Sequence, residues 1–302
     1  MKIISGNSHP LLAKQLSDAL GIPLTAITTQ RFPDQETFVE IHEKVADEDV
    51  FVLQSTSHPA NDNLMELLMI IDALKQNTAR SITAIIPYFG YARQDQQTEP
   101  GTPLSAKLVA TLLQAAGVER LLTCDLHSDR VEGFFDIPVN NLSMTPFFAQ
   151  EIQHCFQNPL IISPDGGGIA RAQALATHLK ADLAIIEKHR HGPGHTEVIT
   201  IKGAVAGRTC LIIDDIIDSG NTLCQAALAL LQKDAQAVHA FITHGVLSGS
   251  AHEQLRLAPL TSLVITDTID TYDKAALCSQ LRTISVVPLL ADCVRRINLT
   301  TP

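Results

Sequence analysis

The chain has 302 residues, of which 45% are apolar and 18% are charged, enough to bury one large hydrophobic core or two smaller ones. Its formal charge of −10 argues against a nucleic-acid partner held by bulk electrostatic attraction, and no apolar run has the length of a membrane span. The N-terminal residues show no signal-peptide pattern, and the six cysteines include no C-x-x-C pair. We therefore expect a cytoplasmic protein whose cysteines are reduced thiols.

Short apolar runs alternate with helical patterns along the chain, which is typical of parallel βα units. In the first half, six runs have the length and composition of strands: residues 2–5, 24–28, 37–41, 50–54, 81–87 and 121–124. Three segments have the spacing of amphipathic helices: residues 10–20, 62–75 and 104–116.

The second half repeats this alternation. Seven runs are predicted to be strands: residues 160–163, 183–186, 198–201, 211–213, 239–243, 263–266 and 284–287. Helices are predicted to begin at Ile169 and Leu223. The two halves begin with weakly similar segments, and residues 140–146 interrupt the pattern between them. We therefore predict an α/β fold with two tandem domains, 1–142 and 143–302, each with a mainly parallel sheet flanked by helices.

Two adjacent acids, Asp214 and Asp215, follow the apolar run 210–213. Ligands of an open α/β sheet bind outside the carboxyl ends of its strands, so this pair is a candidate binding site. Carboxylates accept hydrogen bonds from sugar hydroxyls, or bind Mg²⁺ and its waters.

A turn with phosphate-binding chemistry comes next, made of Asp218, Ser219, Gly220, Asn221 and Thr222. It offers backbone N–H groups, two hydroxyls and the N-terminus of the following helix. Alone, such a turn is also typical of a simple helix cap. Hydroxyl acceptors on one side and a phosphate site on the other together indicate a pentose phosphate as ligand.

Other polar segments follow further apolar runs in the first half. Residues 31–36 place an aromatic side chain and two acids in a turn, which alone reads as a polar hairpin loop. Arg93 follows the run 81–87, where its guanidinium would either clamp phosphate oxygens or pair with Asp95. His127 follows the run 121–124 in the same way, and a single histidine is more often structural than a ligand.

Two segments of the second half also carry chemistry. Asp165 precedes three glycines that open a helix and let a ligand approach the backbone closely. Residues 187–195 contain Lys188, Arg190 and three histidines around a Gly-Pro-Gly run. The histidines suggest zinc, but they share no helical face and no acid or cysteine ligand accompanies them. The glycines and proline favour a mobile lid instead.

These segments, in this order, resemble the ribose-phosphate pyrophosphokinases (PRPP synthetases) along nearly the whole chain, and residues 213–222 also resemble the ribose-5-phosphate loop of phosphoribosyltransferases. The resemblance implies two tandem phosphoribosyltransferase-like domains. It implies transfer of the diphosphoryl group of MgATP to the C1 hydroxyl of ribose 5-phosphate, giving PRPP and AMP. It also implies self-association into dimers and homohexamers.

The resemblance further implies a role for each candidate residue. ATP would bind to the adenine loop with Phe32, Asp34 and Glu36, in the same or a neighbouring subunit, and to Arg93, Gln94 and His127. Mg²⁺ would be held by His127 and Asp165, mostly through its waters. Ribose 5-phosphate would bind to Asp214, Asp215 and the turn 218–222. Lys188 and Arg190 would be catalytic, although His189 stands between them where the family usually has another arginine.

Two other functions stay open at this point. A phosphoribosyltransferase would bind PRPP as a substrate through residues 213–222, but it needs no second domain with an adenine loop. A non-catalytic regulatory relative would keep the fold and lose catalytic groups, whereas Lys188, Arg190, His127 and Asp165 are all present.

The segments that correspond to a regulatory site depart from the best-known branch of the family. In that branch, phosphate activates and ADP inhibits at a shared site between subunits. Here Lys44 and Ala46 replace the serine and arginine of one segment, and Asp129 and Glu132 replace a serine and glutamine of another. The chain also stops short of the usual tail. We therefore expect a phosphate-independent enzyme, because a bidentate arginine is lost and two carboxylates are added.

Overall fold

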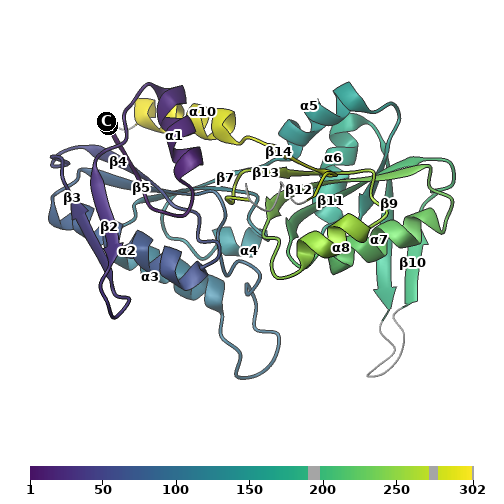
Figure 1. Cartoon of the computed structure of the whole chain (residues 1–302), viewed down its shortest axis with the longest axis horizontal. Helices are drawn as coiled ribbons and strands as arrows, with labels where there is room; N and C mark the ends of the chain where they lie inside the picture. Colours follow the sequence, from purple (N-terminus) through teal and green to yellow (C-terminus); the bar gives the residue numbers. More distant parts are fainter. Residues whose placement is uncertain (190–197, 272–277, 301–302) are drawn as a thin grey trace. The chain divides into compact units, whose positions relative to one another are not determined.

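The computed structural model describes residues 1–189, 198–271 and 278–300, and the chain forms two compact units (Figure 1). The first unit comprises Met1–Leu142, Thr268–Asp270 and Ser285–Pro302, and the second comprises Ser143–Asp267 and Thr271–Ile284. None of the described helices is both long and apolar enough to cross a bilayer.

The first unit is built on a five-stranded parallel sheet with the order β1-β4-β5-β6-β7. Its strands are β1 (Lys2–Ser5), β4 (Asp49–Leu53), β5 (Ser81–Ile86), β6 (Arg120–Cys124) and β7 (Val139–Leu142). An antiparallel hairpin, β2 (Ile27–Arg31) and β3 (Thr37–Ile41), stands apart from this sheet. Strand β4 is buried along its whole length and β5 from its second residue on, as expected when helices cover both faces.

Helices cover both faces of this sheet: α1 (Pro10–Leu20) and α10 (Val287–Thr300) on one, α2 (Ala60–Gln76) and α3 (Ser105–Ala116) on the other (Figure 1). A short helix, α4 (Asp129–Glu132), follows β6. Helix α10 packs against α1, and the Arg295 guanidinium donates a hydrogen bond to the Ala19 carbonyl. The sequence placed every residue after 142 in the second domain, whereas residues 268–270 and 285–302 fold with the first unit.

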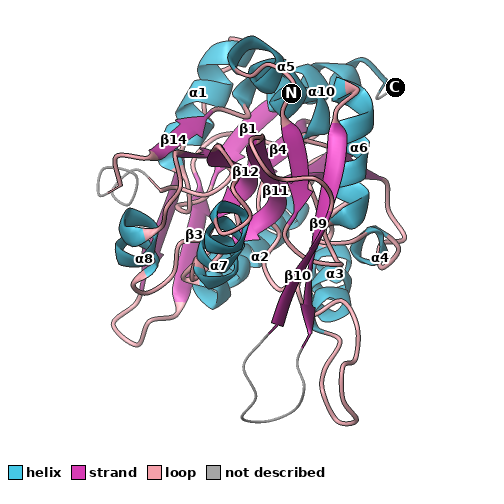
Figure 2. Ribbon diagram, turned by 90° about the vertical axis from the view of Figure 1, so that its right-hand side faces the viewer, coloured by secondary structure: helices cyan, strands magenta, loops and turns pink. Residues whose placement is uncertain are grey.

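The second unit contains a seven-stranded sheet with the order β10-β9-β8-β11-β12-β13-β14. Its strands are β8 (Leu160–Ser163), β9 (Asp182–His189), β10 (Val198–Lys202), β11 (Thr209–Ile217), β12 (Ala237–Gly245), β13 (Ser262–Thr266) and β14 (Leu281–Ile284). All neighbours are parallel except β9 and the edge strand β10 (Figure 2). Helices α5 (Thr145–Cys155) and α6 (Ile169–Leu179) lie along one face, and α7 (Asn221–Leu231) and α8 (Ala251–Leu257) along the other (Figure 1).

The expected α/β fold with parallel sheets flanked by helices is confirmed, and the departures from the expected elements are local. Strand β7 includes Asn140 and Asn141, which the sequence pattern had placed in an interruption. Residues 284–287, expected to be a strand, instead end β14 and begin α10. The expected strand 24–28 begins only at Ile27, after Leu24 makes a single bridge with Ile3.

Strand β11 is longer than expected, and this matters for the site. It pairs with β8 only as far as Ile212, but with β12 as far as Ile217. The sequence ended the strand at residue 213 because acids rarely continue a buried strand. In the structure Asp214 and Asp215 are part of the strand, on the stretch that only β12 supports.

At the amino end of the first unit's sheet, a buried carboxylate is fully paired. Asp49, at the start of β4 and 5% exposed, accepts hydrogen bonds from the Arg80 guanidinium and from the Ser81 hydroxyl at 2.7 Å. The Arg80 hydrogen bond lowers the pKa of Asp49 below its ordinary value. Ligands of parallel sheets bind at the opposite, carboxyl ends of the strands, so this cluster has a structural role.

Candidate active site

The centre of the candidate site in the second unit is the carboxylate pair on β11. Asp215 is 4% exposed, and its backbone N–H donates to the Asp214 carboxylate at 2.9 Å. Arg171, from helix α6, approaches both acids: its Nη1 lies 3.0 Å from Asp215 Oδ1 and 3.7 Å from Asp214 Oδ1. One guanidinium therefore serves two carboxylates, so the pair carries an excess of negative charge when both acids are ionised.

The surroundings of Asp214 change its ionisation. Burial, then the adjacent Asp215 carboxylate, and then Asp165 together raise the pKa of Asp214 to about 8. Arg171 opposes the shift. A site with this balance favours a ligand that brings hydroxyl donors or a cation to the carboxylates.

Arg171 is the functional residue that sequence reasoning missed. It is the third residue of α6, where the positive end of the helix dipole disfavours a cation. A basic residue at such a position implies a nearby anion, and that signal was available in the sequence. Its partner could not be read from the sequence, because Asp215 lies 44 residues further along the chain.

The predicted phosphate turn is placed directly after β11. Gly220 has φ +83°, a conformation suited to glycine, and helix α7 begins at Asn221. Ser219, Asn221 and Thr222 are exposed at this helix N-terminus, where backbone N–H groups favour an anion. Asp218 instead holds the turn in place, because its carboxylate accepts a hydrogen bond from the Ser248 hydroxyl and its carbonyl accepts one from the Ser248 backbone N–H.

Asp165 shapes the glycine turn that leads into α6. Its Oδ1 accepts hydrogen bonds from the backbone N–H groups of Gly167 at 2.9 Å and Gly168 at 3.0 Å. His127, its expected partner for Mg²⁺, is exposed after β6 in the other unit, so a shared metal site stays a prediction. Within the described residues, no three acid, histidine or cysteine side chains converge on one ion position.

The oxygen donors at β11 nevertheless suit Mg²⁺. The ion prefers oxygen ligands and typically uses one or two carboxylates together with waters and substrate phosphates. Burial, together with the charges of Asp215 and Asp165, raises the pKa of Asp214, and a cation bound beside these carboxylates would favour the ionised form of Asp214.

The candidate ATP segments lie in the first unit. Phe32 starts the loop between β2 and β3; its ring is 45% exposed and contacts Phe38 edge to face, with centroids 5.6 Å apart. The loop is closed by a hydrogen bond from the Phe32 N–H to the Glu36 carbonyl and by one from the Glu36 N–H to the Asp34 carboxylate. An exposed ring on a fixed loop is suited to stacking on a base.

Arg93 and Gln94 are exposed on the turn after β5. Asp95, the alternative partner expected for Arg93, accepts hydrogen bonds from the Ser128 hydroxyl and from Arg130. Gln94 is anchored by α3: its carbonyl accepts from the Ala106 N–H, and its side-chain oxygen accepts from the Ser105 hydroxyl.

The predicted catalytic segment is described only in part. Lys188 lies on β9, opposite Ile199 of β10. Arg190 and the predicted lid lie outside the described residues, as do the histidines at 191 and 195.

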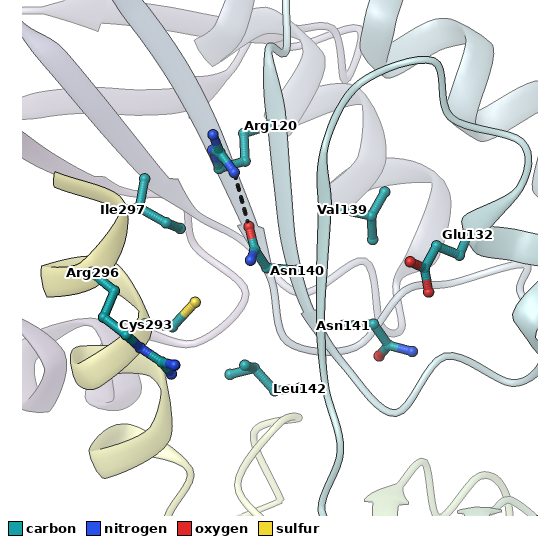
Figure 3. Close-up of a pocket in the computed structure, with 9 residues that line it drawn as sticks. All are labelled: Arg120, Glu132, Val139, Asn140, Asn141, Leu142, Cys293, Arg296 and Ile297. Atoms are coloured by element: carbon teal, nitrogen blue, oxygen red, sulfur yellow. Dashed lines mark hydrogen bonds between the residues drawn. The ribbon is translucent and has the colours of Figure 1, made fainter. Parts of the chain in front are cut away.

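A cavity of about 500 Å³ in the first unit is lined by Glu132, one of the residues at the expected regulatory site (Figure 3). Its lining also includes two arginines: Arg120, which donates to Asn140 at 3.3 Å, and Arg296, which pairs with Asp292 at 2.9 Å. The sequence predicted a lost arginine at Ala46 and two added acids, Asp129 and Glu132, at the regulatory site, and of these positions the cavity lining includes Glu132. The cavity and its immediate partners instead contain two positive and two negative side chains.

Comparisons with known proteins agree with these motifs. Residues 1–117 match the N-terminal domain of ribose phosphate pyrophosphokinase, and residues 189–301 match the phosphoribosyl synthetase-associated domain. A ribose-phosphate pyrophosphokinase of Granulibacter bethesdensis is 52% identical over 300 residues, which cover 99% of this chain and 97% of that protein. The chain belongs to the ribose-phosphate pyrophosphokinase family.

Further family members show the same extent of similarity. The ribose-phosphate pyrophosphokinase of Caulobacter vibrioides is 51% identical over 301 residues, covering 98% of this chain and 96% of that protein. The crystal structure of phosphoribosylpyrophosphate synthetase from Mycobacterium smegmatis has a TM-score of 0.94 and 37% identity, with 99% of each chain covered. The fold of this family member therefore extends over nearly the whole of this chain.

The raised pKa of Asp214 predicts a pH-dependent effect of Asp214→Asn on stability in EDTA-treated protein. A carboxyl group whose pKa is higher in the folded state stabilises the fold at low pH, and this contribution is lost as the pH rises through the folded pKa of about 8. Asparagine does not ionise, so the Asp214→Asn variant keeps this stability as the pH rises. Thermal unfolding should show a Tm about 3 °C or more above wild type at pH 8 and nearly equal to it near pH 4.

Asp182→Asn is the matched control, because this exposed acid of the same unit pairs with Arg208 at the surface. It should not raise the Tm at either pH. A Tm of Asp214→Asn at or below that of wild type at pH 8 would show that Asp214 is ionised without cost.

Proposed function

We propose that this protein is a ribose-phosphate diphosphokinase, which transfers the diphosphoryl group of MgATP to the C1 hydroxyl of ribose 5-phosphate and releases PRPP and AMP. The observation that carries the proposal is the full-length similarity to ribose-phosphate pyrophosphokinases, with 52% identity over 99% of the chain. The geometry of the β11 acids and the turn that follows them supports the same substrate.

Ribose 5-phosphate binds in the second unit in this proposal. Asp214 and Asp215 accept hydrogen bonds from the sugar hydroxyls, and Arg171 holds their side chains in place. The 5-phosphate binds to the N-terminus of α7 and to the exposed hydroxyls of Ser219 and Thr222. Asp218 and Gly220 shape the turn, and Asn221 begins the helix.

In this proposal MgATP binds through residues of the first unit, so that each domain binds one of the two substrates. The exposed Phe32 ring stacks on adenine, with Asp34 and Glu36 beside it, in the same or a neighbouring subunit. Arg93 and Gln94 bind the phosphates. His127 and Asp165 would hold Mg²⁺, which would supply positive charge to neutralise the phosphates.

Lys188 and Arg190 act on the transferred group. Nucleophilic attack occurs at the β-phosphorus, so negative charge develops on the diphosphoryl group and on the departing AMP. Two basic side chains that approach this charge stabilise the transition state more than the ground state. Positioning and electrostatics dominate, as in other phosphoryl transfers.

We also propose that the protein works in the cytoplasm and self-associates into dimers that form a homohexamer. A coupled assay tests the function itself: incubation with Mg²⁺, ATP and ribose 5-phosphate should give AMP and PRPP in equal amounts. A phosphoribosyltransferase would consume PRPP with a base, and a regulatory relative would form neither product.

Lys188→Ala and Arg190→Ala should each lower kcat by about 100- to 1,000-fold, the scale for losing one transition-state donor. The affinity for ATP should change little, because the charge that these residues stabilise grows only during transfer. Steady-state kinetics and direct ATP binding measure the two effects separately.

Lys202→Ala is the control, because this lysine pairs with Glu187 on the neighbouring strand and its side chain is 63% exposed. It should retain wild-type kcat. If Lys188→Ala weakened ATP binding while kcat held, the residue would bind substrate and transition state equally.

The cavity lined by Glu132 predicts activity without added phosphate. Its two guanidinium groups are already bound to Asn140 and Asp292, and Glu132 adds a further negative charge. Counting Asp292, which pairs with Arg296 beside the cavity, the two arginines are matched by two acids, which leaves little net attraction to a phosphate ion. A phosphate titration in phosphate-free buffer should therefore leave the rate within about twofold. Activation of tenfold or more, or ADP inhibition that saturating ATP does not relieve, would contradict this expectation.

A further inference from the structure

Asp95 is a buried carboxylate that joins two segments of the first unit. It directly follows Gln94, and only 6% of its surface is exposed. Its Oδ2 accepts one hydrogen bond from the Ser128 hydroxyl and another from Arg130 Nη1 at 3.2 Å. Ser128 directly follows His127. The carboxylate therefore connects the turn after β5 to the turn after β6.

In contrast to the buried Asp95, the residues next to it and to Ser128 in the chain are exposed. Arg93, Gln94 and His127 are exposed, whereas Asp95 lies beneath the surface. These three exposed side chains are the groups assigned above to the nucleotide. A buried residue below a ligand site can set the distance between the side chains that bind the ligand without contacting the ligand itself.

Both connected turns contain a strained residue. Tyr91 has φ +65° and Asp125 has φ +34°, although neither is glycine. Such conformations are unfavourable for residues other than glycine and persist where the surrounding contacts enforce them. The first turn is also held by the Thr56 hydroxyl, which accepts a hydrogen bond from the Gly90 N–H at 2.6 Å. That contact fixes the turn to the segment that follows β4, whereas Asp95 fixes the two strained turns to each other.

We propose that Asp95 is a positioning residue for the nucleotide: its carboxylate holds the Arg93–Gln94 turn and the His127 segment in the relative placement that binds ATP phosphates. The inference rests on the proposed function for the identity of the ligand. Its physical basis is that a charge-assisted hydrogen bond in a buried site fixes geometry more strongly than a neutral one.

The first unit contains a matched control for a purely structural role. Asp49 is equally buried and also accepts hydrogen bonds from one serine hydroxyl and one arginine, Ser81 and Arg80. That cluster lies at the amino ends of β4 and β5, away from the candidate ligand groups. A stability effect should appear at both clusters, and an effect on ATP should appear only at Asp95.

The experiment compares Asp95→Asn and Ser128→Ala with Asp49→Asn and Ser81→Ala, varying MgATP at saturating ribose 5-phosphate and the reverse. Asp95→Asn and Ser128→Ala should lower kcat/KM for ATP about tenfold or more and leave the KM for ribose 5-phosphate within twofold. Combining them should cost no more than Asp95→Asn alone. Ser128→Thr, which keeps the hydroxyl, should restore kcat/KM. The Asp49 and Ser81 variants should lower the Tm and keep both kinetic constants within twofold.

The inference is overturned if Asp95→Asn and Ser128→Ala keep wild-type kcat/KM for ATP, or if kcat/KM falls equally for both substrates. If Asp95→Asn does not fold, Ser128→Ala decides, because it removes a single hydroxyl. Calorimetric binding of MgATP separates this result from the proposed function. If the wild type binds MgATP but forms no PRPP, the proposed function is refuted. The inference about Asp95 still holds in that case if Ser128→Ala weakens MgATP binding about tenfold. A wild type that binds no MgATP refutes both.

Discussion

The pairing of one arginine with two adjacent acids, Arg171 with Asp214 and Asp215, is the constraint on which the second unit's site depends. Acids on a buried strand are costly unless they are paired, and here a single guanidinium offsets only part of their charge. Burial and the neighbouring Asp215 carboxylate therefore raise the pKa of Asp214. The site is therefore electrostatically incomplete by itself, and ligand hydroxyls or a cation complete it.

The topology of the sheet makes this arrangement possible. Strand β8 stops pairing with β11 at Ile212, so the acid-bearing end of β11 is supported by β12 alone. The chain after β8 enters the glycine turn of Asp165 and then α6, which brings Arg171 to the acids. The chain after β11 enters the phosphate turn and α7. Two βα units whose strands are neighbours in the sheet, β8–α6 and β11–α7, thus supply the three parts of the proposed sugar phosphate site.

Much of this could be predicted from the sequence, because strands and helices of a parallel α/β fold have distinct periodicities and ligand groups follow the strands. The strands β1 and β8, for example, begin and end where the apolar runs do. Long-range partners could not be predicted. The Arg171–Asp215 and Asp95–Ser128 contacts join residues 44 and 33 positions apart, and no local pattern encodes them. The packing of α10 on α1 escaped for the same reason.

The central claim is that the Asp214–Asp215 pair binds the sugar of ribose 5-phosphate. Calorimetric titration of Asp215→Ala with ribose 5-phosphate, in the presence of Mg²⁺, tests it most directly, with circular dichroism to verify the fold. The account predicts a folded protein whose affinity for ribose 5-phosphate falls at least about tenfold, the loss for hydrogen bonds to a charged group. A folded variant with wild-type affinity would show that the sugar binds elsewhere.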